Sequence, residues 1–277
     1  MEATTIARPT SAITPPPGGA ATHTVEVLAA EWHKLRTVRS TWWALAAVTV
    51  FNVVTAAVLG IVLPGAMSAR DQATGHPAGL TLSGLHLSQI AIGVPGVLVI
   101  TSEYTSGMIP ATLAAVPARR LVLAAKTAVL AAVAVAAGLA TCYAAYFVFQ
   151  VFLPAGSPLR ISLSSPGVAR AVTGAGLYLA VLALAGLGLG AILRSSAGAI
   201  TALFGLLFVP TLIMALLPAS WQNTVGPYLP MNAAEAIYNT GAGHQAHLAP
   251  WAGFGVLCGY AAVALIAGFI LIGRRDA

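Results

Sequence analysis

The strongest constraint on the fold is a set of six long segments that contain no Asp, Glu, Lys or Arg. They cover residues 40–69, 72–102, 127–159, 171–193, 195–234 and 236–273. Each is longer than the roughly 20 residues that a helix needs to cross about 30 Å of hydrocarbon. The pattern predicts an all-α integral membrane protein with six transmembrane helices, over residues of about 41–63, 80–101, 127–153, 171–193, 196–217 and 251–272.

Composition argues against a soluble domain of the same length. Charged residues make up 7% of the chain, whereas soluble domains carry about 25%, so they are too few to cover a water-facing surface. The formal charge of +6 does not indicate a nucleic-acid partner, because the basic residues form no patch with interleaved aromatic side chains. They stand at the ends of the apolar segments instead.

The basic residues also predict the orientation of the chain. Six crossings put both termini on one side, and Lys and Arg accumulate on the cytoplasmic side of a membrane. With both termini inside, ten basic residues are cytoplasmic: Arg8, Lys34, Arg36, Arg39, Arg119, Arg120, Lys126, Arg194, Arg274 and Arg275. Only Arg70, Arg160 and Arg170 are then external. We expect a multi-pass plasma-membrane protein with cytoplasmic termini, and a tight cytoplasmic turn at Arg194, because a lone Arg within a span is costly.

The chain lacks the motifs of several chemistries. No G-x-x-x-x-G-K-[ST] phosphate loop, H-E-x-x-H zinc motif or G-x-S-x-G turn occurs, so we expect neither an enzyme nor a cofactor bound by this chain. His244 and His247 are three residues apart, but no third metal ligand accompanies them. The expected span interiors also lack ionisable residues, with His86 near one end as the closest, which disfavours an ion-coupled secondary transporter.

The segment before the first span predicts an amphipathic helix. Residues 1–24 are rich in Thr, Pro, Gly and Ala and predict a disordered cytoplasmic tail. The helix that follows has one apolar face, made of Leu28, Trp32, Leu35, Val38 and Trp42. Its remainder is polar, with Glu31, His33, Lys34 and Arg36. This pattern favours a helix lying in the lipid interface. The alternative is a cytoplasmic extension of the first span.

The loop between the second and third spans concentrates charge and also holds an apolar tip. Thr105 or Ser106 can cap a short helix, and Gly107 permits close approach of another backbone. Leu113 and Val116 would then form an exposed apolar tip, of the kind that docks into a groove of a partner protein. The alternative is a solvated loop whose Arg119 and Arg120 serve only to orient the chain.

Two further stretches are informative: one predicts close packing of helices, and the other is an unusually long connector between two spans. Gly186 and Gly190 form a G-x-x-x-G pair, which lets helices approach closely in lipid, either within the chain or between two copies. Residues 218–250 are long for a connector. We expect a shallow re-entrant region there, with Asn232 capping a short helix that carries Glu235. Glu235 lies either at the extracytoplasmic mouth or on the exposed surface.

Five stretches together resemble a known family. They are "EWHKLRTVRSTWW", "EYTSGMIPATLAAVPARRLVLAAK", "GLGLGAILRSSAGAI", "YLPMNAAEAI" and the terminal "RRDA". With these five stretches in this order, the chain resembles the type-2 ATP-binding-cassette (ABC) permeases common in actinobacteria. The resemblance covers nearly all of residues 25–277. Glu103 and Gly107 match the E-x-x-x-G element of that family's coupling loop.

The resemblance implies a fold and partners. It implies an elbow helix before the first span, marked by Trp32, Leu35 and Arg36. It implies a coupling helix that contacts a separate ATPase subunit, with the residues Glu103, Gly107, Ile109, Leu113 and Val116. It also implies re-entrant helices between spans five and six, with Asn232 and Glu235 at the outer mouth. ATP and Mg²⁺ would be bound by the ATPase partner.

The function that follows is the permease subunit of an ABC exporter. Two copies would form the translocation path in contact with membrane lipid, and the ATPase would drive it. The competing hypotheses are an ATP-independent secondary transporter or channel, and a membrane-embedded enzyme. No nucleophile–base or metal-ligand spacing supports the enzyme.

Overall fold

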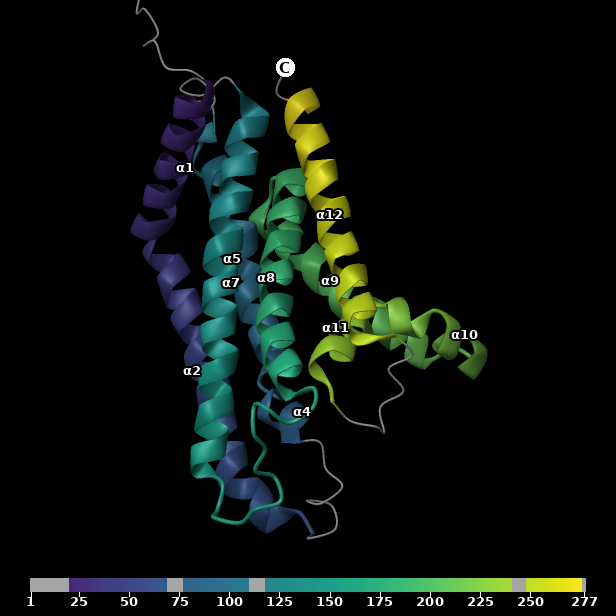
Figure 1. Cartoon of the computed structure of the whole chain (residues 1–277). Coiled ribbons are helices and arrows are strands. Elements are labelled where there is room, and N and C mark those ends of the chain that lie inside the picture. The colour runs from purple at the N-terminus through teal and green to yellow at the C-terminus, as the bar shows by residue number, and fades with distance from the viewer. Residues whose placement is uncertain (1–19, 69–76, 110–117, 241–247, 276–277) are drawn as a thin grey trace, which may run out of the picture.

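The computed structural model describes residues 20–68, 77–109, 118–240 and 248–275, and all regular structure in these ranges is helical (Figure 1). Six helices are long and apolar enough to cross a membrane, which confirms the six predicted segments. They are α2 (Arg39–Ala66), α5 (Leu85–Thr105), α7 (Arg119–Phe152), α8 (Val168–Leu193), α9 (Ser196–Ala215) and α12 (Pro250–Arg275). The largest extensions beyond the predicted bounds are those of α5, which continues to Thr105, and of α7, which already begins at Arg119.

Five shorter helices complete the described chain: α1 (Ala20–Thr37), α4 (Pro77–Thr81), α10 (Ala219–Thr224), the 3-10 helix η1 (Gly226–Tyr228) and α11 (Pro230–Tyr238). Helix α1 begins inside the segment that was expected to be a disordered tail, whose residues 1–19 lie outside the described ranges. A one-residue break at Val38 separates α1 from α2, so the separate helix predicted before the first span is present. Its place relative to a membrane stays a prediction.

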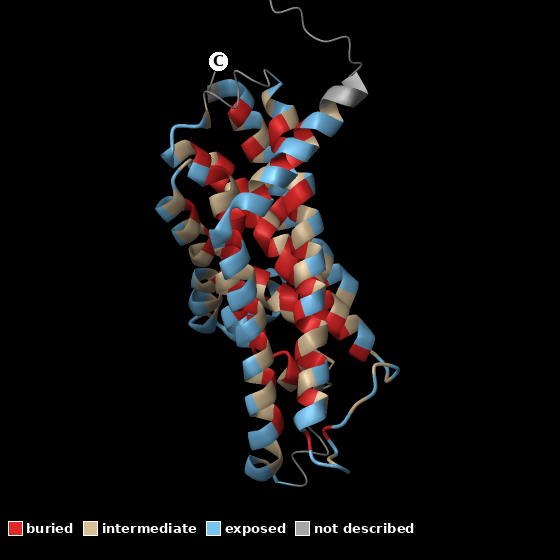
Figure 2. Ribbon diagram, turned by 90° about the vertical axis from the view of Figure 1, so that its left-hand side faces the viewer, coloured by how far each residue is buried: buried red, intermediate tan, exposed pale blue. Residues whose placement is uncertain are grey.

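The six long helices alternate in direction, so the ends of the bundle collect different parts of the chain. Helix α1, the end of α5, the start of α7 and the end of α12 lie at one end, the upper end in Figure 1. Helix α4 and the loop between α7 and α8 lie at the other end. Buried residues face the interior of the bundle, while the outer faces of α2 and α12 are largely exposed or intermediate (Figure 2).

Helix α8 is the central element, and it packs on α5, α7 and α12. Glycines allow these close contacts. A Cβ atom added to Gly186 would lie 2.9 Å from the carbonyl oxygen of Gly93 on α5, and one added to Gly190 would lie 3.1 Å from that of Val97. On another face of α8, a Cβ at Gly188 would lie 2.6 Å from the backbone of Ala264 on α12. Gly186 and Gly190 therefore pack within the chain.

The turn between α8 and α9 is as short as the sequence indicates. Arg194 ends α8 in the left-handed conformation, with φ 55°, and its guanidinium lies 5.2 Å from the ring centroid of Tyr104. Ser195 then caps α9, because its hydroxyl accepts a hydrogen bond from the backbone N–H of Gly198 at 3.3 Å. The chain thus reverses from one long apolar helix into the next over two residues.

The connector between α9 and α12 contains α10, η1 and α11, and one prediction about it is wrong. Asn232 does not cap α11, because the helix begins at Pro230 and its N-cap residue is Leu229. The Asn232 side chain instead donates to the carbonyl oxygen of Gly226 at 2.8 Å and so fastens η1 to α11. Helix α11 packs on α12, α8 and α9. Whether this connector re-enters a membrane stays a prediction.

Candidate functional site

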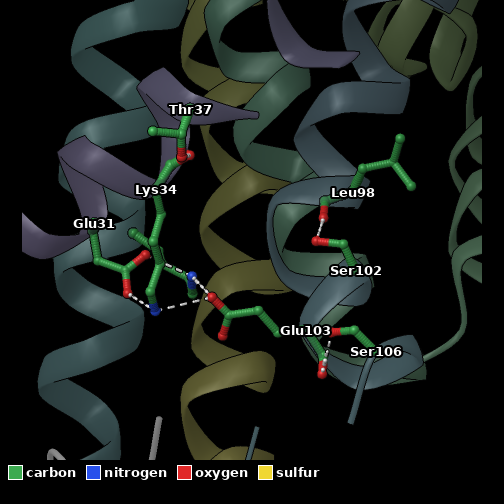
Figure 3. Close-up of polar contacts among 8 residues, drawn as sticks. Glu31, Lys34, Thr37, Leu98, Ser102, Glu103 and Ser106 are labelled. Atoms are coloured by element: carbon green, nitrogen blue, oxygen red, sulfur yellow. Dashed lines mark hydrogen bonds and ion pairs between the residues drawn. The ribbon is translucent and has the colours of Figure 1, made fainter. Parts of the chain in front are cut away.

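Four charged side chains from three helices meet at the upper end of the bundle, and we call them the charge network: Glu31 and Lys34 from α1, Glu103 from α5 and Lys126 from α7. The Lys126 Nζ atom lies 2.6 Å from an oxygen of Glu31 and 2.6 Å from Glu103 Oε1. The Lys34 Nζ atom lies 2.9 Å from the other oxygen of Glu31 and 3.2 Å from Glu103 Oε1. Figure 3 shows the carboxylates of Glu31 and Glu103 facing each other across the lysine nitrogens.

The network is buried and its charges balance. Glu31, Glu103 and Lys126 are 5%, 7% and 3% exposed. Removing charges from water is costly, and two carboxylates with two ammonium groups offset that cost only by close pairing. For Lys34 partial burial lowers the pKa, but the hydrogen bond and charge of Glu31, with those of Glu103, raise it above its usual value overall. The network therefore fixes α1 to α5 and α7 through charge-assisted hydrogen bonds.

The structure corrects the predicted position of two of these residues. Glu103 and Lys126 were expected in a loop between two spans, but both lie inside helices, because α5 and α7 extend past the expected boundaries. Both residues lie just outside the uncharged segments 72–102 and 127–159, but the long helices that contain those segments include them. Each helix carries one buried charge near the same end of the bundle, and the sequence gives no sign that the two face each other.

The buried face of α1 also differs from the predicted one. The face that packs on the bundle holds Val27, Glu31 and Leu35, which are 5%, 5% and 6% exposed. Trp32 is 42% exposed, and Arg36 is exposed as well. The predicted residues Leu28 and Trp32 each lie one position after a residue that is buried, Val27 and Glu31. Glu31 was therefore wrongly assigned to the polar side. Of the predicted residues, Leu35 lies in the core, and Leu28 is partly buried against it.

A glycine ends α5 directly beside the network. Gly107 has φ 67°, its N–H donates to the carbonyl of Tyr104 at 3.3 Å, and the N–H of Met108 donates to that of Glu103 at 3.0 Å. These two bonds define a Schellman motif, which requires a left-handed residue. Thr105 and Ser106 thus belong to the C-terminal end of α5 and do not start a new helix.

The close approach of another backbone expected at Gly107 stays a prediction. Among the residues that the structure describes, no atom lies within 4 Å of a Cβ added there, and the positive φ is the reason for a glycine that the structure does show. Ile109 is the last described residue before a gap. Leu113 and Val116, the expected apolar tip, lie in residues 110–117, outside the described ranges.

The Schellman motif makes one prediction. Changing Gly107 to alanine should lower the free energy of unfolding by about 1 kcal/mol, because a Cβ disfavours the left-handed region. Gly107→Asn should cost less, since asparagine tolerates this conformation. Thermal unfolding of the two purified variants checks the order. Equal melting temperatures for wild type and Gly107→Ala would contradict the assigned conformation.

A groove of about 550 Å³ lies next to the charge network, between α1, the start of α2, α5 and α7. Its walls are mainly apolar and include Leu35, Leu98, Val99 and Val129. All four charged residues of the network also line it. Pockets of 300–1,000 Å³ with apolar walls and a few polar groups are typical of small-molecule sites.

A second polar group lies towards the opposite end of the bundle. Glu235 on α11 is half-buried, and one of its oxygens lies 3.8 Å from Nε2 of His86 on α5. On the same turn of α5, Ser88 is hydrogen-bonded to Asn52, and Gln89 to Tyr178. Glu235 is thus not the exposed surface acid that was one of its two expected positions. Its pairing with His86 was not predicted from the sequence.

The described residues contain no group of three or more His, Cys, Asp or Glu side chains that could hold a metal ion. His244 and His247 lie outside the described ranges. What the site can do follows from its geometry: it can couple the positions of three helices, and its polar atoms that line the groove can form hydrogen bonds with a bound molecule. No family model matches the chain, and no curated protein matches it.

Proposed function

We propose that this chain is the permease subunit of an ABC exporter, with two copies forming the translocation path and a separate ATPase subunit supplying ATP hydrolysis. The observation that supports the proposal best is the position of the charge network. Glu103 lies two residues before the end of α5, and Lys126 lies seven residues after the start of α7. The intervening loop, residues 106–118, is the segment whose sequence resembles a coupling loop.

The network gives such a loop a means of acting on the bundle. A force on the loop moves the end of α5 and the start of α7, and the ion pairs of Glu31 carry that movement to α1. Packed elements joined in this way move as units and not by continuous deformation. In this proposal, closure of the ATPase pair displaces α1, α5 and α7 together.

The proposed orientation has the network at the cytoplasmic face. Lys34, Arg119 and Arg274 belong to helix ends at the same end of the bundle, whereas Arg160 and Arg170 belong to the opposite end. This distribution supports cytoplasmic termini under the positive-inside rule. The ATPase would then meet the protein beside the charge network, in the plasma membrane.

The partner is tested by purification from native membranes. The wild-type chain should co-purify with a protein that contains a Walker phosphate-binding motif, and a gene for it is expected next to the gene of this chain. Leu113→Asp should leave insertion intact but abolish co-purification, because complete burial of a Leu-sized side chain contributes about 1.5–3 kcal/mol.

Arg119→Ala is the matched control within the same segment. We assign this residue to membrane orientation, so its pull-down and ATP turnover in proteoliposomes should equal those of the wild type. Glu103→Ala should reduce coupled turnover more than it reduces co-purification. If Leu113→Asp retains both its partner and its turnover, the segment is a solvated loop and the proposal is wrong.

One observation favours the alternative of an ATP-independent secondary transporter. That alternative was disfavoured because the expected spans lacked ionisable groups, but Glu103 and Lys126 are buried inside long apolar helices. Buried ionisable residues of this kind also occur in proton relays. Transport by proteoliposomes that contain only this chain and a proton gradient would support the alternative. Transport that requires both an ATPase and ATP would reject it.

A further inference from the structure

The groove beside the charge network is rich in hydrogen-bond acceptors. The hydroxyls of Thr37, Ser102 and Ser106 line it, and each donates its proton to a backbone carbonyl of its own helix. Their oxygen lone pairs remain available as acceptors. Figure 3 shows Ser102 and Ser106 on the same helix as Glu103, and Thr37 beside Lys34. The groove therefore offers hydrogen-bond acceptors to a bound ligand.

One acceptor is buried and has no partner. Glu103 Oε1 receives both lysines, but Glu103 Oε2 is buried and has no hydrogen-bond partner among the residues that the structure describes. The residue is 7% exposed and lines the groove. A buried carboxylate oxygen that accepts no hydrogen bond destabilises the folded protein. A ligand that donates a hydrogen bond to this oxygen would therefore bind more favourably.

We propose that this groove binds an amphiphile that carries a primary ammonium group on an apolar tail. The ammonium would donate to Glu103 Oε2 and to the hydroxyl oxygens, and the tail would lie against Leu98, Val99 and Val129. An anionic head group suits the site less well, because it would meet the unpartnered carboxylate oxygen and because each lysine ammonium already uses two of its three donors on carboxylates.

The surroundings of the groove indicate entry from the lipid side. Val38 and Met108 line the groove and are 45% and 51% exposed. Next to Val38, helix α2 carries an exposed apolar surface that includes Trp43, which is 76% exposed. A molecule dissolved in lipid can thus reach the groove without leaving an apolar surface. The site does not depend on the energy source of the proposed transport.

Equilibrium binding tests the proposal. The full chain is reconstituted in nanodiscs of phosphatidylcholine and phosphatidylglycerol, which contain no primary amine, and radiolabelled dodecylamine is titrated against empty nanodiscs. We expect saturable binding with one molecule per chain. Dodecyltrimethylammonium has the same charge but no N–H donor, so it should compete at least tenfold more weakly. Dodecyl sulfate should not compete.

Substitutions in the groove provide the second arm. Ser102→Trp fills the groove without removing a member of the charge network and should weaken dodecylamine binding at least tenfold. Met108→Trp at the rim provides a second variant if the first fails to fold. Ser220→Trp, at an exposed serine of α10, is the matched control and should bind like the wild type.

The source of the amine is determined by adding phosphatidylethanolamine to the nanodiscs. Displacement of dodecylamine assigns the groove to a lipid head group, and unchanged binding assigns it to a free amphiphilic amine. Non-saturable uptake would overturn the proposal, as would equal competition by the trimethylammonium compound. Full binding by a folded Ser102→Trp variant would also overturn it.

Discussion

Changing Lys126 to alanine should lower the free energy of unfolding by about 3–5 kcal/mol, the range found when one member of a buried ion pair is removed. Lys126 is the member of the network with both carboxylates at 2.6 Å, and it is 3% exposed. Without it, Glu31 and Glu103 face each other with only the partly exposed Lys34 between them. We expect α1 to separate from α5 and α7, which is measured by denaturant titration of the purified protein and by proteolysis of α1.

Lys34→Ala is the matched control within the same network. Its side chain is 35% exposed, and ion pairs that reach solvent contribute at most about 1 kcal/mol. The double variant Lys126→Met with Glu103→Gln should recover part of the loss, because it removes one uncompensated negative charge together with the lysine. An effect of Lys126→Ala no larger than that of Lys34→Ala would contradict the buried network.

Changing Gly186 to leucine should disrupt the seam between α5 and α8 and lower stability by about 3 kcal/mol or more, at the upper end of the costs of overpacking. A Cβ at this position would lie 2.9 Å from the carbonyl oxygen of Gly93 and 3.2 Å from the backbone nitrogen of Val97. Because the facing atoms are backbone, no side-chain rotation relieves the clash, and the helices must move apart. Thermal unfolding and gel-filtration profiles in detergent measure the effect.

The control for this variant is a glycine at an exposed position of a long helix. Gly259 on α12 is exposed, and nothing lies within 4 Å of a Cβ added there. Gly259→Leu should therefore leave the melting temperature unchanged or raise it slightly, since leucine favours a helix more than glycine does. If both leucine variants lose the same stability, the loss comes from helix propensity or expression and not from the seam.

The sequence predicted the six long helices because their signal is local. An uncharged segment of sufficient length needs no information from the rest of the chain to be identified. The short turn at Arg194 was predicted for the same reason, since the two apolar segments on each side are long enough alone. Helix ends were less certain, and the ends of α5 and α7 moved by four and eight residues from their predicted positions of 101 and 127.

The charge network could not be predicted, because its contacts join residues far apart in the chain. Glu31 and Lys126 are 95 positions apart, and Lys34 and Glu103 are 69 apart. On α1, the apolar periodicity predicts a buried face that contains Trp32, and it assumes that Glu31 belongs to the polar side. That assumption fails where a distant helix supplies the counter-charge.

The unpredicted features of the connector have the same cause. Asparagine is a common helix cap, but the Asn232 side chain donates a hydrogen bond to the carbonyl oxygen of Gly226 in the preceding 3-10 helix. A sequence pattern does not distinguish this hydrogen bond from helix capping. His86 was considered as a lone histidine near the end of a span, whereas α11 brings Glu235 to it. Residues 110–117, on which the proposed coupling depends, stay a prediction from sequence alone.

The length of chain between the partners of the network has a consequence for biosynthesis. Lys126 is made 95 residues after Glu31, which at 5–20 residues per second is an interval of about 5–20 s. During that time the carboxylate of Glu31 has Lys34 as a partner on its own helix, three residues away. The local pair would thus keep the Glu31 charge compensated in the nascent chain until α7 emerges, and α1 would dock only after the third long helix has been inserted.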